Sequence, residues 1–142
     1  MLRPEHIFLP ATLLVFHSLI VILITGNARL KAVKAGKVDP RYFKLYQGVD
    51  CPDNLITLSR NITNLFELPV LFYLATVVFF LLNQVNTINL VLCALFVLLR
   101  LLHTFIHITS NKVPLRFKAF LIGYFVLVAI WMRIARALIM GG

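Results

Sequence analysis

Four long runs of apolar residues divide the chain, at His6–Ala28, Leu55–Leu82, Thr87–Ile108 and Leu115–Ile139. A helix of about 20 predominantly apolar residues spans a bilayer core, and each run is long enough to do so. Backbone polar groups inside a membrane must be satisfied within the segment, which a helix achieves. The pattern therefore predicts an all-α integral membrane protein, a four-helix bundle whose single domain covers residues 1–142.

Pro69 interrupts the second run, which is the longest of the four. Proline removes one backbone donor and clashes with the preceding turn of a helix, so we expect the second helix to kink there. Pro114 lies at the start of the fourth run, where a helix tolerates proline at its first positions.

Composition supports a membrane protein and changes the interpretation of the charge. Hydrophobic residues make up 61% of the chain and charged residues 13%, whereas soluble domains are near half apolar and about a quarter charged. The net charge of +9 would suggest nucleic acid as the partner of a soluble protein. Here the basic residues gather between the apolar runs and no nucleic-acid-binding motif accompanies them, so the expected partner is the lipid bilayer.

The distribution of charge between the loops predicts the orientation of the chain. The first loop contains six basic residues, Arg29, Lys31, Lys34, Lys37, Arg41 and Lys44, whereas the second, Asn83–Asn86, contains none. Positively charged loops stay in the cytoplasm, which places both termini on the opposite side. The basic residues also follow the first run as a stop-transfer signal, so we expect that run to be a retained span. The two cysteines, Cys51 in a polar loop and Cys93 within an apolar run, are not expected to meet.

Ionisable residues inside the predicted spans form helical faces. They follow the i, i+3, i+4, i+7 spacing in the second span, as Arg60, Thr63, Asn64 and Glu67, and in the third, as Arg100, His103, Thr104 and His107. Arg116 opens the fourth span and Arg29 ends the first. Such residues are expensive in a membrane and usually face a bundle interior or a cavity. All four spans direct them to the cytoplasmic half.

This combination suits a small anionic ligand that also carries a cation. Arginines bind carboxylates through paired hydrogen bonds, and a carboxylate such as Glu67 binds an ammonium group or orients an arginine. Three alternatives remain. In the first, Glu67 forms a structural ion pair with Arg60 or Arg100. In the second, the two histidines satisfy packing or, with Glu67, ligate a metal, although the excess of arginine disfavours a bound cation. In the third, the chain is a small transporter, which is disfavoured because the polar groups extend only halfway across the membrane.

Three stretches of the sequence resemble the MAPEG family, the membrane-associated proteins in eicosanoid and glutathione metabolism. Thr25–Leu30 is similar to the end of the family's first helix. Arg60–Pro69 resembles its second-helix signature, an arginine, an asparagine four residues on and a glutamate three further. Arg100–Arg116 resembles the end of helix three and the start of helix four. The resemblance covers nearly the whole chain.

The resemblance implies a homotrimer of twelve helices, with glutathione bound between protomers towards the cytoplasm. The residues that match glutathione-contacting positions are Arg29, Arg60, Asn64, Glu67 and His103, and His107 stands where family enzymes have a tyrosine. Arg116 matches the arginine that stabilises the glutathione thiolate. A free thiol has a pKa of about 8.5, and a close guanidinium lowers it.

We therefore expect a glutathione transferase or peroxidase that acts on a lipophilic electrophile, with no metal and with Arg116 as the catalytic residue. The sequence departs from the family at four positions, Thr63, His107, Phe117 and Phe120. The alternative is a non-catalytic membrane binding or scaffold protein with an anion pocket. A bacterial protein of this kind would lie in the inner or plasma membrane, and a eukaryotic one in the endoplasmic reticulum.

Overall fold

The computed structural model describes residues 2–46 and 50–140, and this part of the chain is helical without any strand. A short 3-10 helix, η1 (Pro4–Ile7), leads into α1 (Phe8–Lys34), and the loop that follows contains the short helix α2 (Tyr42–Leu45). The remaining helices are α3 (Asp53–Leu65), α4 (Leu68–Leu81), α5 (Thr87–Ile108) and α6 (Val113–Met140).

Four helical segments are long and apolar enough to cross a membrane: Pro4–Lys34, Asp53–Leu81, Thr87–Ile108 and Val113–Met140. The four predicted spans are therefore confirmed, and the third has the predicted bounds. The first helix continues to Lys34 and does not end at Arg29, since the basic stretch beyond the apolar run consists mostly of good helix formers. The chain is an integral, multi-pass membrane protein, and large apolar side chains such as Leu9, Leu23 and Leu98 are exposed on its outer surface.

The second span is broken rather than gently kinked. α3 ends at Leu65, and Glu67 has φ −90° and ψ −96° before α4 begins at Leu68. Pro69 occupies the first turn of α4, where its missing N–H removes no intrahelical bond. The proline thus ends one helix and starts another, and it leaves Glu67 at the junction between them.

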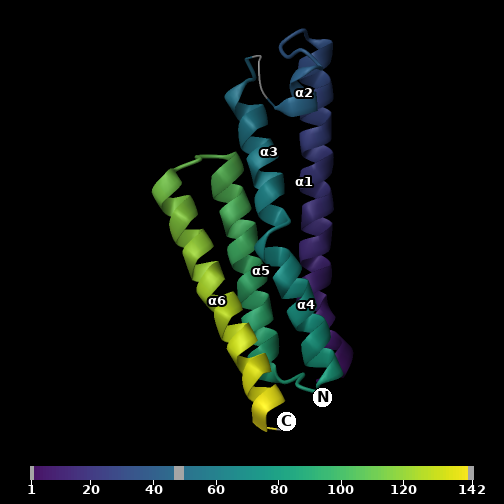
Figure 1. Cartoon of the computed structure of the whole chain (residues 1–142), viewed down its shortest axis with the longest axis vertical. Helices are drawn as coiled ribbons and strands as arrows, with labels where there is room; N and C mark the ends of the chain where they lie inside the picture. Colours follow the sequence, from purple (N-terminus) through teal and green to yellow (C-terminus); the bar gives the residue numbers. More distant parts are fainter. Residues whose placement is uncertain (1, 47–49, 141–142) are drawn as a thin grey trace.

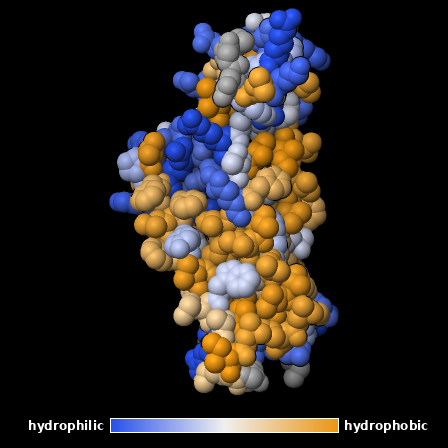
Figure 2. Space-filling model, in the orientation of Figure 1, coloured by the Kyte–Doolittle hydropathy of each residue, from blue (hydrophilic) through white to orange (hydrophobic). Residues whose placement is uncertain are grey.

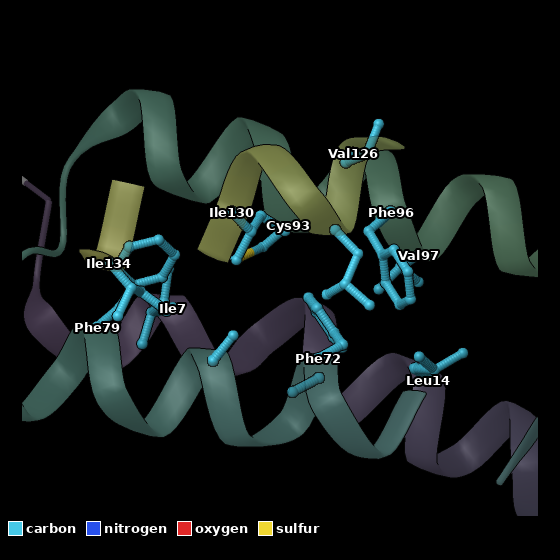
Figure 3. Packing of buried hydrophobic residues seen from close by; sticks show 13 residues of the cluster. Ile7, Leu14, Phe72, Phe79, Cys93, Phe96, Val97, Val126, Ile130 and Ile134 are labelled. Carbon is cyan, nitrogen blue, oxygen red and sulfur yellow. The ribbon is translucent and has the colours of Figure 1, made fainter. Parts of the chain in front are cut away.

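The helices form a bundle in which both termini lie at one end, together with the α4–α5 turn (Figure 1). α5 packs against α6, α1 and α3, and α4 packs against α6 and α1. The core lies between α1, α4, α5 and α6 (Figure 3), where the rings of Phe72 and Phe96 stack with centroids 4.6 Å apart. Cys93 is buried in this core and both cysteines are free, as expected from the sequence.

The other end of the bundle is uneven, because α1 and α3 project beyond the α5–α6 turn (Figure 1). A small second cluster of Ala32, Val38 and Leu55 packs in this projecting part. Hydrophilic side chains gather beside α3 and the α5–α6 turn, whereas the surface below is largely hydrophobic (Figure 2). The hydrophilic side chains visible in this view are thus concentrated towards the end of the bundle opposite the termini.

Candidate functional site

The polar face predicted on the third span is buried inside the protomer. Arg100, His103, Thr104 and His107 on α5 are 2%, 4%, 2% and 1% exposed. The rings of His103 and His107 meet edge to face, with centroids 5.7 Å apart. Their helical spacing places all four on the side of α5 that its neighbouring helices cover.

Arg100 is enclosed by aromatic rings. Its guanidinium carbon lies 5.4 Å from the centroid of Phe96 and 5.2 Å from that of Phe120. Its Nη2 donates to the Phe120 carbonyl oxygen at 3.3 Å, whereas its buried Nε and Nη1 have no hydrogen-bond partner in the described part of the chain. Arg100 therefore does not pair with Glu67 within one protomer, contrary to one of the structural alternatives. Gly123 provides the space, because a Cβ there would lie 2.7 Å from Arg100 Nη2.

The polar face predicted on the second span points away from its own bundle. Arg60, Thr63 and Glu67 are exposed and Asn64 is half-buried. The opposite side of α3 contributes Leu55, Asn61 and Leu65 to the interior, because the apolar positions of this amphipathic helix lie there. Three predicted site residues on α3 and its junction with α4, Arg60, Asn64 and Glu67, are thus available to a ligand or to a second protein surface.

Arg116 lies at the start of α6 and is held by two neighbours. Its Nη1 donates to Asn111 Oδ1 at 2.8 Å and lies 3.4 Å from His107 Nε2. Beside it is a hollow of about 170 Å³. Its lining is Asn64, His103, Val113, Arg116, Phe117 and Phe120. The structure therefore brings together Asn64, His103 and Arg116 from three helices, with His107 behind Arg116.

Arg29 and Arg60 line a different hollow of about 510 Å³, together with Thr63, Ser59 and the α2 tyrosines. Arg29 Nη2 donates to Ser59 Oγ at 2.8 Å. Its guanidinium carbon lies 5.3 Å from the centroid of Phe43 and 5.7 Å from that of Tyr46. The α2 segment thus covers Arg29 with aromatic rings. The predicted residues do not form one continuous site in a single protomer, and Glu67 lines neither hollow.

Arg29 lies beyond the level at which α5 ends. It comes 12 residues after His17, about 18 Å along α1, and the His17 side chain is level with Thr104 on α5. α5 ends four residues after Thr104, about 6 Å farther. The backbone of Arg29 is therefore beyond the end of α5, and its side chain reaches back to Ser59 on α3.

The sequence analysis missed a polar contact that joins three helices. His17 Nε2 lies 3.1 Å from Thr104 Oγ1, and the Thr104 hydroxyl donates to Asn61 Oδ1 at 3.4 Å. Thr104 was assigned to the α5 face, but His17 and Asn61 were not singled out. A histidine in the middle of the first apolar run was the available signal, since ionisable residues are rare at that depth. Among residues 2–46 and 50–140, no three His, Cys, Asp or Glu side chains are arranged to hold a metal ion.

Comparison with known proteins identifies the family. The MAPEG family model matches residues 7–136, which is nearly the whole chain. No curated protein and no solved structure matches the chain. The matched range contains most of each of the four spans, and Arg60, Asn64, Glu67 and Arg116 lie within it. The chain therefore belongs to the MAPEG family, whose members are membrane proteins of the glutathione and eicosanoid metabolism type.

Proposed function

We propose that this protein is a glutathione-dependent membrane enzyme that acts on a lipophilic electrophile arriving from the bilayer. The observation that carries the proposal is the hollow beside Arg116. It combines a fixed guanidinium, an imidazole from His103 and an amide from Asn64. The exposed apolar surface of the helices gives a lipophilic substrate access from the membrane.

The surrounding residues fit the chemistry of glutathione, a tripeptide with two carboxylates, an ammonium group and a thiol. Arg29 and Arg60 offer guanidinium groups for the carboxylates, and Glu67 offers a carboxylate for the ammonium group. His107 Nδ1 and Arg29 Nε are buried without hydrogen-bond partners. A buried polar group without a hydrogen-bond partner costs free energy, so binding of a polar ligand that supplies the missing hydrogen bond is favourable.

The separation of the two hollows favours a ligand that bridges two subunits. In one protomer Arg29 lies with Arg60, whereas Asn64, His103 and Arg116 lie in the other hollow. Glu67 is exposed and lines neither hollow. We propose a homotrimer in which Arg29 of one protomer completes the site formed by α3, α5 and α6 of the next. A membrane interface between protomers also shields the charges of α3 from lipid.

The chemistry assigned to Arg116 is electrostatic. The thiol proton passes to water, and the guanidinium stabilises the sulfur anion that remains. In a transfer reaction the thiolate forms a carbon–sulfur bond, and the leaving group departs with the electron pair of the bond that breaks. In a peroxidase reaction two glutathione molecules are oxidised to the disulfide, while the hydroperoxide is reduced to an alcohol and water.

A second candidate function is non-catalytic binding of the same ligand. Phe117 and Phe120 line the hollow beside Arg116, and neither brings a hydroxyl to the position of the sulfur. Tyr124, one turn beyond Phe120, lines a different, apolar hollow with Leu127 and Trp131. A hydroxyl next to Arg116 would add a hydrogen-bond donor for the thiolate, so its absence from this lining favours binding without turnover.

Calorimetry of the detergent-purified protein with glutathione tests the proposal. We expect saturable binding, which Arg60→Gln should weaken more than Lys118→Gln, because Lys118→Gln removes the same charge from an exposed residue outside the site. Turnover of chlorodinitrobenzene, from which the thiolate displaces chloride, then separates enzyme from binding protein. Absence of glutathione binding by folded wild-type protein would refute both functions. Native mass spectrometry in mild detergent tests the assembly, and monomers alone would contradict the trimer.

A further inference from the structure

The end of the bundle opposite the glutathione candidates contains a second basic hollow, of about 440 Å³. It lies between the α4–α5 turn and the last turns of α6, and its lining is Gln84, Arg133, Arg136, Ala137 and Met140. Neither arginine belongs to the candidate functional site. Hydrophilic surface also reappears at this lower end of the molecule (Figure 2).

Arg133 is held in place from behind by Asn89, which is 1% exposed. Arg133 Nε donates to Asn89 Oδ1, and Asn89 Nδ2 donates to the Gln84 carbonyl oxygen at 2.6 Å. The Asn89 backbone N–H donates to Asn86 Oδ1 at 3.0 Å, which fixes the start of α5. Arg133 is thus oriented through one edge of its guanidinium, and its Nη groups make no hydrogen bond within residues 2–46 and 50–140.

The positive charge of this hollow is not balanced by the described part of the chain. Arg136 follows Arg133 by three residues, on the same face of α6, and it is exposed. Glu5 in η1 is the carboxylate of the described residues that lies at this end, and it forms no ion pair with either arginine. Two guanidinium groups one turn apart are therefore available to an anion from outside the described residues.

The depth of these arginines identifies the source of that anion. Arg116 opens α6 at the predicted cytoplasmic boundary, and Arg136 follows it by 20 residues, about 30 Å along the helix. This length equals the thickness of a bilayer's hydrocarbon core, about 30 Å. Arg136 is therefore placed at the opposite boundary of the hydrocarbon core and Arg133 less than one turn inside it, from which long guanidinium side chains reach the level of the phospholipid phosphates. Exposed apolar side chains, among them Met132, Leu138 and Ile139, flank them.

We propose that the hollow binds the phosphate group of a phospholipid in the non-cytoplasmic leaflet. Arg133 and Arg136 bind its oxygens through paired, charge-assisted hydrogen bonds, as guanidinium groups bind phosphate elsewhere. The acyl chains lie along the apolar surface of α6. The bound lipid ties the end of α6 to the α4–α5 turn, since Arg133 is joined to that turn through Asn89 and Gln84. This proposal does not depend on glutathione binding at the other end.

Native mass spectrometry of the detergent-purified full chain tests the proposal, with phosphatidylglycerol added as the probe. The matched lipid is a galactosyl diacylglycerol with the same acyl chains and no phosphate. We expect the wild type to retain phosphatidylglycerol and not the glycolipid. Inorganic phosphate, added as a competitor, should displace little of the lipid, because it lacks the acyl chains. Equal retention of both lipids, or binding of inorganic phosphate as tight as that of the lipid, would overturn the proposal.

Two variants locate the site. Arg136→Gln is the cleaner one, because Arg136 makes no hydrogen bond within the described residues and its loss should not disturb the fold. We expect it to weaken phosphatidylglycerol retention about fivefold, the effect of one basic group near a membrane surface. Arg133→Gln should weaken retention at least as much. Lys34→Gln, at the end of α1, removes one exposed charge from the opposite side of the membrane and should leave retention unchanged. Equal retention by Arg136→Gln and Lys34→Gln would refute the site.

Discussion

Replacement of Gly123 by alanine tests whether the buried Arg100 is fixed as the structure describes. An added Cβ would lie 2.7 Å from Arg100 Nη2 and 3.5 Å from its Cζ and Nε. Non-bonded heavy atoms prefer separations of about 3.5–4.0 Å, so the guanidinium must withdraw by about 1 Å. It is enclosed by Phe96 and Phe120 and is only 2% exposed, which leaves little room for that movement.

The expected cost follows from the bond that the movement breaks. Arg100 Nη2 donates to the Phe120 carbonyl oxygen at 3.3 Å, and a hydrogen bond from a charged group contributes about 1.5–3 kcal/mol. Alanine stabilises a helix by about 1 kcal/mol relative to glycine, which offsets part of this loss. We therefore expect Gly123→Ala to lower the free energy of unfolding by about 0.5–2 kcal/mol.

Gly26→Ala is the matched control, because a Cβ on this α1 glycine meets nothing within 4 Å. The control should gain up to about 1 kcal/mol from helix propensity alone. Reversible unfolding in mixed detergent micelles, followed by circular dichroism, measures both variants. If Gly123→Ala is as stable as Gly26→Ala, Arg100 does not occupy the described position, and the account of its packing is wrong.

Four further predictions concern the site and the orientation of the chain. Arg116→Ala should lower turnover of chlorodinitrobenzene by roughly two to three orders of magnitude, because the interaction of Arg116 with the sulfur strengthens as the sulfur becomes anionic. Glutathione affinity measured by calorimetry should change by about threefold or less. Equal losses of turnover and affinity would contradict the catalytic role of Arg116. Glu67→Gln should weaken glutathione affinity or reduce the yield of folded oligomer, and unchanged values of both would remove Glu67 from the site. Phe120→Tyr should raise turnover if the protein is an enzyme, whereas an unchanged rate supports a binding protein. A cysteine at Lys37 should resist an impermeant thiol reagent in intact cells, and its labelling would reverse the orientation.

The sequence predicted the four spans and their helical type because membrane spans give a strong signal. About 20 apolar residues in succession leave few alternatives to a helix. Pro69 likewise marked the interruption of the second span. The extent of the break at Glu67 was not predictable, because proline in a membrane helix produces anything from a bend to a new helix start, and packing decides which.

The i, i+3, i+4, i+7 pattern predicted which polar residues share a face, but not where each face points. The α5 face around Arg100 is buried, whereas the α3 face around Arg60 is exposed. Both patterns contain arginine and neutral polar groups, so only the packing of the neighbouring helices distinguishes them. The contact between His17 and Thr104 joins residues 87 positions apart, and nothing in the local sequence pairs them.

The imbalance of charge in the predicted cytoplasmic half links the fold of this protein to its proposed ligand. Arg60, Arg100 and Arg116 lie on α3, α5 and α6, and Glu67 is a carboxylate at the junction of α3 and α4. Arg100 Nε and Nη1 have no partner among the described residues, and a buried, unpaired charge is strongly unfavourable in a membrane. A subunit interface that brings Glu67 of another protomer closer reduces this cost only in part, since one carboxylate faces three guanidinium groups. A ligand with two carboxylates would supply the remaining negative charge, so the arrangement that leaves the isolated protomer electrostatically unbalanced is also the one that would favour the anionic peptide proposed as its ligand.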